Sequence, residues 1–287
     1  MEPDPSSPET SQTASAPHIA AGFDEPADGI LSFVGEPGDV PPSGDHGILE
    51  VLEITKVLEN AGVCCCLVGI CALRYFGAMR VRHDWEICVP TDLLETAAHV
   101  FNSEPHNQTY KPCRPKRLHF ASLYHTFPRF KIRGVDLYFV LIPDDDAYIH
   151  CIPSNIERSQ TGLPYPKLPM FAQSLLETDD EVALTDLVDG MDLSEEWGRE
   201  NLDLDGIIDN AWAVKKNDKI RATVPLTETS CLLEHYIRPA SKEEVWKETV
   251  SKKEHRIGPE LPKEYFSTRF HSRDLGDPRL LPDRTYV

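Results

Sequence analysis

Two acidic side chains alternate with apolar ones in the short stretch "DWEICV", residues 84–89. Every second side chain of a strand lies on the same face, so Asp84 and Glu86 would point one way and Trp85 the other, into the core. Like charges placed side by side in a half-buried sheet are unfavourable unless a cation or a proton lies between them. The spacing therefore predicts a cation or a proton between the two carboxylates.

A third acid, Asp136, stands near the start of a later apolar stretch, "VDLYFVLI", which could form a neighbouring strand. Three carboxylates on neighbouring strands form a hard oxygen site suited to one or two Mg²⁺ or Mn²⁺ ions. A purely structural interpretation stays open, because acids at strand ends are common and Asp84 could cap a turn. The candidate metal ligands and catalytic residues are Asp84, Glu86 and Asp136.

The elements that would position these acids can be traced along the chain. Apolar residues at helical spacing predict a helix from residue 48 to the stop at Gly62, and "VCCCLVG" then predicts a buried strand. A helix follows over "ICALRYFGAM", then the strand with the acids, then a helix over residues 91–101. "RFKI" and "VDLYFVLI" flank "RG" and predict a β-hairpin that turns at Arg133 and Gly134.

Together these pieces resemble the polymerase-beta-like nucleotidyltransferase superfamily. That family has a strand ending in a hydrophobic residue followed by Gly-Gly or Gly-Ser, a spacer, an acid-hydrophobic-acid motif and a third acid. The matching pieces are "VGI" at 68–70, a spacer of thirteen residues from 71 to 83, "DWEI" at 84–87 and "VDL" at 135–137. Over residues 48–142 the chain looks like a degenerate member, similar to uncharacterised fungal proteins with nucleotidyltransferase domains.

The resemblance implies a metal-dependent transfer of a nucleoside monophosphate from a triphosphate to an acceptor that the sequence does not name. Asp84 and Glu86 would hold both metal ions, and Asp136 would hold the catalytic one. Gly69 would let backbone N–H groups approach the triphosphate, while Ile70 stands where the family has Gly or Ser. The alternative is a catalytically weak or inactive module that binds a ligand or a partner.

Composition divides the chain into four parts. Residues 1–46 hold nine Asp or Glu, eight prolines and no Lys or Arg, which predicts a disordered acidic tail. Residues 47–150 would form a small mixed α/β domain, 151–255 a mostly helical region and 256–287 an extended tail. The predicted fold class is α+β, with a small mixed sheet flanked by helices and disordered ends.

A formal net charge of −18 and a pI near 5.0 argue against general nucleic-acid binding, which requires clustered Lys and Arg. The one basic stretch, 111–133, has seven Lys or Arg and no acid, and we interpret it as a solvated face of a hairpin. The acidic helices and tails leave a protein partner open. The longest apolar stretch, 61–79, contains Arg74 and is too short for a membrane span.

The chain has eight cysteines, three of them consecutive, and their spacing matches no zinc motif. Such cysteines are typical of small buried apolar residues in a reducing compartment, so neither a structural zinc site nor a disulfide framework is predicted. The N-terminal stretch lacks a basic region followed by an apolar run, so we expect no secretory signal. We expect an intracellular protein, cytoplasmic or nuclear, and not a secreted one.

Overall fold

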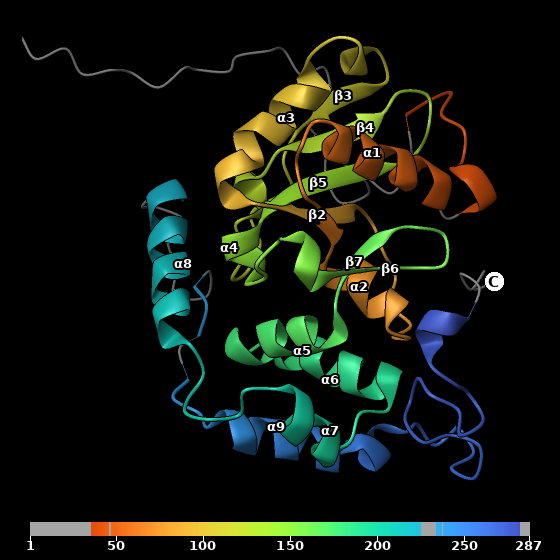
Figure 1. The fold of residues 1–287 in the computed structure, drawn as a ribbon, viewed down its shortest axis with the longest axis vertical. Helices are drawn as coiled ribbons and strands as arrows, with labels where there is room; N and C mark the ends of the chain where they lie inside the picture. The colour runs from red at the N-terminus through yellow and green to blue at the C-terminus, as the bar shows by residue number, and fades with distance from the viewer. Residues whose placement is uncertain (1–35, 46, 225–233, 237, 282–287) are drawn as a thin grey trace, which may run out of the picture. The chain divides into compact units, whose positions relative to one another are not determined.

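The computed structural model describes residues 36–45, 47–224, 234–236 and 238–281. Most of the predicted disordered tail, residues 1–35, lies outside the described residues. The described residues confirm the α+β class, with a mixed five-stranded sheet flanked by helices (Figure 1). In the described part of the chain, no helix is long and apolar enough to span a membrane.

The central sheet has the strand order β1-β2-β5-β4-β3. Strand β2 pairs antiparallel with β1 and parallel with β5, while β4 pairs antiparallel with both β5 and β3. The predicted hairpin is confirmed as β4 and β5. The strands span Cys66–Leu67 (β1), Trp85–Val89 (β2), Tyr110–Cys113 (β3), Arg129–Ile132 (β4) and Tyr138–Pro143 (β5).

One face of this sheet is apolar and is covered by helices α1 (Ile48–Asn60) and α3 (Leu94–Asn102), as Figure 1 shows. The Phe101 ring of α3 lies with its centroid 5.3 Å from that of Phe130 in β4 and 5.0 Å from that of Phe139 in β5. Helix α1 matches the predicted bounds and stops before Gly62, whose φ of 77° suits a residue without Cβ. The opposite face of the sheet is therefore the one that can carry polar side chains.

A small two-stranded sheet, β6 (Ile156–Arg158) and β7 (Pro164–Pro166), leads from the central sheet into the predicted helical region. Tyr165 of β7 stacks on Tyr75 of α2, with 4.0 Å between the ring centroids. The remaining helices are α2 (Gly69–Tyr75), α4 (Asp144–Ala147), α5 (Leu168–Glu177), α6 (Glu181–Met191), α7 (Glu195–Asn201), α8 (Asn210–Thr223) and α9 (Lys242–Ser251).

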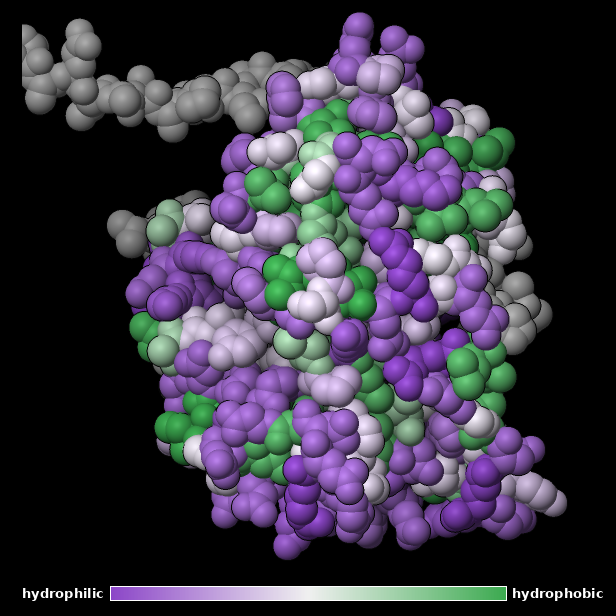
Figure 2. Space-filling view, viewed as in Figure 1, coloured by the Kyte–Doolittle hydropathy of each residue, from purple (hydrophilic) through white to green (hydrophobic). Residues whose placement is uncertain are grey.

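Several of these helices begin at side-chain caps. Ser194, Asp209 and Ser241 each accept a hydrogen bond from a backbone N–H group in the first turn of α7, α8 and α9. Such caps satisfy amide groups that have no partner within the helix and stabilise the helix by about 1 kcal/mol each. The space-filling view in Figure 2 shows hydrophilic residues over most of the visible face, with hydrophobic ones in small scattered groups.

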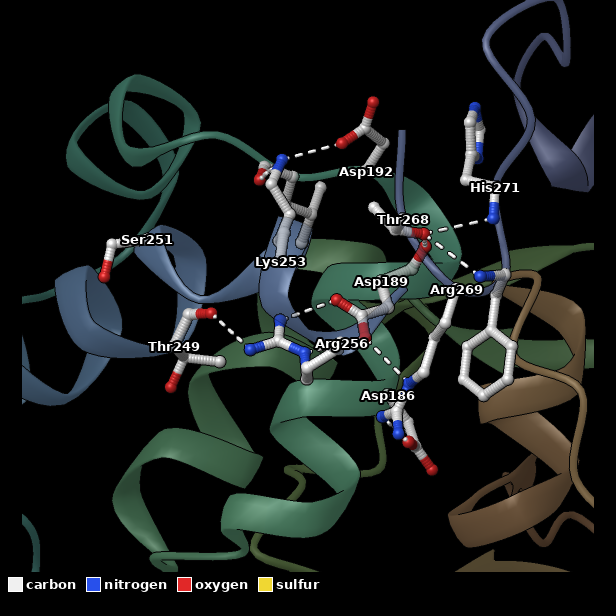
Figure 3. Close-up of polar contacts among 12 residues, drawn as sticks. Asp186, Asp189, Asp192, Thr249, Ser251, Lys253, Arg256, Thr268, Arg269 and His271 are labelled. Atoms are coloured by element: carbon white, nitrogen blue, oxygen red, sulfur yellow. Dashed lines mark hydrogen bonds and ion pairs between the residues drawn. The ribbon is translucent and has the colours of Figure 1, made fainter. Parts of the chain in front are cut away.

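A buried ion-pair network joins α6 to segments distant in sequence (Figure 3). Asp186 and Asp189, exposed by 1% and 0%, lie on α6. Arg80, which follows α2, contacts Asp186, and Arg256 forms two hydrogen bonds with Asp189, of 2.6 and 2.8 Å. Arg269 contacts both acids, at 2.5 and 2.8 Å. The predicted C-terminal tail is thus held against α6 over its described part.

Residues 36–45, the described part of the predicted N-terminal tail, also contact the sheet. Val40 forms a backbone bridge with Val135, and the carboxylates of Glu36 and Asp39 pair with Lys131 of β4. Residues 43–45 then form a single 3₁₀ turn ahead of α1. Composition predicted a disordered tail here, because Lys131, which pairs with these acids, lies some ninety residues later in the chain.

Candidate functional site

The site is built on β2, whose acids lie on the polar face of the sheet. Asp84 directly precedes the strand and Glu86 lies within it, and each is only 7% exposed. Trp85 points to the opposite face and is buried, as predicted, with the guanidinium carbon of Arg82 3.4 Å from its ring centroid. The alternation read from the sequence therefore does place the two carboxylates together.

A cation lies between these carboxylates, and it is a lysine side chain. The Lys116 Nζ atom is 3.6 Å from Asp84 Oδ2 and 3.8 Å from Glu86 Oε1. Arg129 of β4 adds a second positive charge, because its Nε and Nη2 atoms donate to the two oxygens of Asp84 at 2.8 and 3.2 Å. The positive charge beside the two acids is therefore supplied by side chains of the protein itself, whereas the sequence predicted Mg²⁺ or Mn²⁺ at this position.

Glu86 is held by groups from three parts of the chain. Its Oε2 atom accepts a 3.0 Å hydrogen bond from the N–H group of Ile70, and the nearby Tyr124 hydroxyl favours the ionised form of the same carboxylate. Burial raises the pKa of Glu86, and the nearby charge of Asp84 acts in the same direction, while Lys116 and these two groups oppose the rise. Glu86 is therefore the acid of the pair that takes up a proton more readily than an ordinary glutamate.

The glycine of the motif is required by Glu86. Gly69 has a φ of 56°, and a Cβ atom on it would lie 1.9 Å from Glu86 Oε2. The Ile70 side chain is half-buried at the start of α2, and the N–H group of this residue is already bonded to the carboxylate. In this arrangement, a backbone amide next to Gly69, where the resemblance implies an approach to a triphosphate, binds Glu86 instead.

Asp136 does not join the pair. It is exposed and lies in the turn before β5, where its N–H group donates to the Val40 carbonyl at 3.0 Å. Trp85 pairs with Phe139, so Asp84 is level with Tyr138 and Asp136 falls two residues short, about 7 Å along the strand. Among the described residues, the one group of three potential metal ligands within 4.8 Å of one another consists of cysteines. The structure therefore brings together two of the three predicted acids.

The sequence interpretation missed the basic half of the site. The stretch 111–133 was predicted to be a solvated face, which holds for Arg114, Arg117 and Arg133. It was wrong for three other basic residues, since Lys116 and Arg129 lie beside the acids and the Lys131 side chain is 0% exposed. Across the sheet, Arg129 pairs with Val140, which pairs in turn with Glu86, so the three residues share one face. The signal was the absence of acids from this basic stretch, since its charges then need partners elsewhere.

The residues as arranged do not fit the Mg²⁺ or Mn²⁺ ions that the family resemblance implies. Both oxygens of Asp84 accept hydrogen bonds from Arg129, one oxygen of Glu86 accepts one from the Ile70 amide, and the other lies 3.8 Å from the Lys116 ammonium. With Asp136 outside the cluster, the third carboxylate of a two-metal site is missing as well. A hard divalent cation needs free carboxylate oxygens, and it would have to displace protein donors from this pair.

No protein-family model matches the chain, and no curated protein matches it either. Among solved structures, the chain is similar to ANT(2″)-Ia in complex with adenylyl-2″-tobramycin, with 9% identity over 58% of this chain and 97% of that chain and a TM-score of 0.35. It is also similar to the Megavirus polyadenylate synthase, with 11% identity over 75% of this chain and 44% of that chain and a TM-score of 0.27. Likenesses at these TM-scores carry no argument about what this chain does.

Proposed function

We propose that this chain is a nucleotidyltransferase-like protein whose acidic pair is neutralised by its own side chains and which acts as a binding or interaction module without metal-dependent transfer. The observation that carries the proposal is the Lys116 ammonium, 3.6 and 3.8 Å from the two carboxylates. The two buried carboxylates repel each other unless a positive charge lies near them. A lysine of the same chain supplies that charge without a separate binding step. The module would comprise residues 47–150, with the helical region 151–255 packed beside it.

A second candidate, transfer of a nucleoside monophosphate to an acceptor, is favoured by one observation. The Lys116 side chain is 28% exposed, and it lies in a segment without regular helix or strand. Its distances to the two acids exceed those of a hydrogen bond, so this cation is the weakest-held neighbour of the pair. Metal-dependent transfer would require Mg²⁺ or Mn²⁺ to displace this ammonium and a nucleoside triphosphate to displace Glu86 from the Ile70 amide.

The two candidates separate in a thermal unfolding experiment on the full chain with and without Mg²⁺ or Mn²⁺. For the module, we expect the parent midpoint to be unchanged by millimolar metal and the Lys116→Met variant to melt lower, because its carboxylates repel each other. Metal should then restore part of the variant's midpoint by binding the folded state. Lys111→Met is the matched control, since Lys111 pairs with Glu36 on the same sheet face, away from the acids.

The same preparations should be assayed for pyrophosphate release from each nucleoside triphosphate with Mg²⁺ or Mn²⁺. The module proposal predicts no release above that of a Glu86→Gln variant. Release by the parent that the Glu86→Gln variant lacks, together with a metal-dependent midpoint in the parent, would overturn the proposal in favour of transfer.

A further inference from the structure

Three buried thiols converge on the polar side of the sheet, next to the acidic pair. The Sγ atoms of Cys66, Cys88 and Cys151 all lie within 4.8 Å of one another. The three side chains are exposed by 0%, 0% and 1%. No spacing motif connects them, because they come from three separate segments of the chain.

Two of the thiols are fixed by the strand ladder. Cys66 of β1 and Cys88 of β2 are direct partners in the antiparallel register, so their side chains stand beside each other. Cys151 follows α4, and its Sγ atom lies 3.6 Å from the Cys88 carbonyl oxygen and 3.7 Å from that of Cys64. Backbone pairing and these contacts therefore hold the three sulfur atoms in place.

Burial of small apolar residues does not by itself bring sulfur atoms together. Cys65 is just as buried, at 1%, yet its thiol contacts the Thr55 carbonyl oxygen, 3.9 Å away in α1. Consecutive residues of an extended chain point to opposite faces, so Cys65 lies away from the cluster while Cys66 belongs to it. The grouping is a product of the register between β1 and β2.

We propose that Cys66, Cys88 and Cys151 form a binding site for a thiophilic divalent cation of the zinc type, with Cys64 as the fourth ligand. Thiolate sulfur is the ligand that zinc-type ions bind in closed protein sites, and four-coordinate geometry places the sulfurs about 3.8 Å apart. Cys64 is half-buried, and its carbonyl oxygen lies 3.7 Å from the Cys151 sulfur; its own sulfur lies outside the group of three and would move toward them to complete the site. Ligands at 64 and 66 lie two residues apart and so share a face.

Metal binding would exchange the thiol protons for the ion. Each coordinating thiol releases its proton to solvent as its sulfur bonds to the metal, so affinity rises with pH. With four thiolates and one divalent ion, the site carries two negative charges. The positive charge of the Arg158 guanidinium favours the thiolate form of Cys64. Cys88 follows Glu86 by two residues on the same face, so the ion would brace the strand that carries the acids.

The test uses the full chain, reduced and freed of metal with a chelator, and titrated with Co²⁺ as a spectroscopic probe. We expect one equivalent of Co²⁺ to give a thiolate charge-transfer band, Zn²⁺ to displace it, and Zn²⁺ to raise the thermal midpoint. Cys88→Ala should weaken binding at least tenfold, as should Cys151→Ser, a second variant for the case that the first does not fold. The matched control Cys65→Ala should bind like the parent.

Two results would overturn the proposal. One is the lack of a stoichiometric charge-transfer band in the folded parent. The other is equal binding by the Cys88→Ala or Cys151→Ser variant and the parent, which would assign the metal to other side chains, such as the partly exposed Cys113. Neither result bears on the proposed role of Lys116, which is tested with Mg²⁺ and Mn²⁺ at oxygen ligands.

Discussion

Two pairs of buried carboxylates lie within the described part of the chain, one at β2 and one on α6, and they are neutralised differently. Asp186 and Asp189 of α6 face three arginines, and the guanidinium nitrogens approach their oxygens as closely as 2.5 to 2.8 Å. At β2, Arg129 contacts Asp84 alone, and both acids lie near one lysine, whose Nζ atom stays at 3.6 and 3.8 Å. Arginines therefore bind both acids of the α6 pair, whereas the counter-charge of Glu86 is a lysine beyond hydrogen-bond distance.

This difference separates a structural acidic pair from a candidate site. The α6 pair links three distant segments through rigid bidentate contacts, which suits a clamp on the C-terminal part of the chain. The β2 pair has one acid fully engaged, Asp84, and one whose pKa is raised by burial, Glu86. Carboxylates that are buried without a full set of positive charges and hydrogen-bond donors are found at functional sites in many proteins.

The largest expected effect is at the α6 pair. Asp189→Asn should lower the free energy of unfolding by about 3–5 kcal/mol, because it leaves Arg256 and Arg269 without their buried counter-charge. Urea denaturation followed by circular dichroism measures the change. Asp192→Asn is the control, since its carboxylate is 32% exposed and pairs with Lys253. A loss at Asp189 no larger than at Asp192 would mean that the network does not hold the fold.

A smaller loss is expected at Asp84. Asp84→Asn should cost about 2 kcal/mol of unfolding free energy, because Arg129 then keeps its burial but loses a charged acceptor. The cost should shrink in an Arg129→Met background, where the interaction has already been removed, and a double-mutant cycle measures the difference. Equal costs in both backgrounds would show that the ion pair contributes nothing to stability.

The smallest effect is expected at Glu86, and it depends on pH. A raised pKa means that the folded state binds the proton at a higher pH than the unfolded state, whose glutamate titrates near its ordinary 4.5. Glu86 therefore stabilises the fold at low pH, and this contribution is lost as pH rises through the folded-state pKa. Glu86→Gln should remove that slope while leaving stability at neutral pH equal to or above that of the parent.

Unfolding free energies of the parent and of the Glu86→Gln variant, measured at intervals from pH 4 to pH 8, test this expectation. The difference, parent minus variant, should fall as pH rises. A difference that rises with pH would mean that the folded protein favours the ionised form of Glu86, which would contradict its raised pKa.

Local pattern was sufficient for the elements and for half of the site. Helix α1, the strand with the acids and the β4–β5 hairpin were predicted from periodicity and turn residues, because these signals lie within a few neighbouring positions. The pairing of Asp84 with Glu86 followed from the two-residue period of a strand. The position of Asp136 could not be predicted, since a register shift of two residues leaves the periodicity of a strand unchanged.

The sequence by itself determined that two carboxylates lie side by side on one face of a strand and need a positive charge. Only the tertiary structure decided which charge it is, because Lys116 and Arg129 reach the acids from residues thirty and more positions later in the chain. The same holds for the thiols of Cys66, Cys88 and Cys151, which the strand register and a loop bring together. Which side chains share a face of one strand follows from neighbouring positions in the sequence. The partners of a buried charge or thiol come from distant segments, so they depend on how the chain packs.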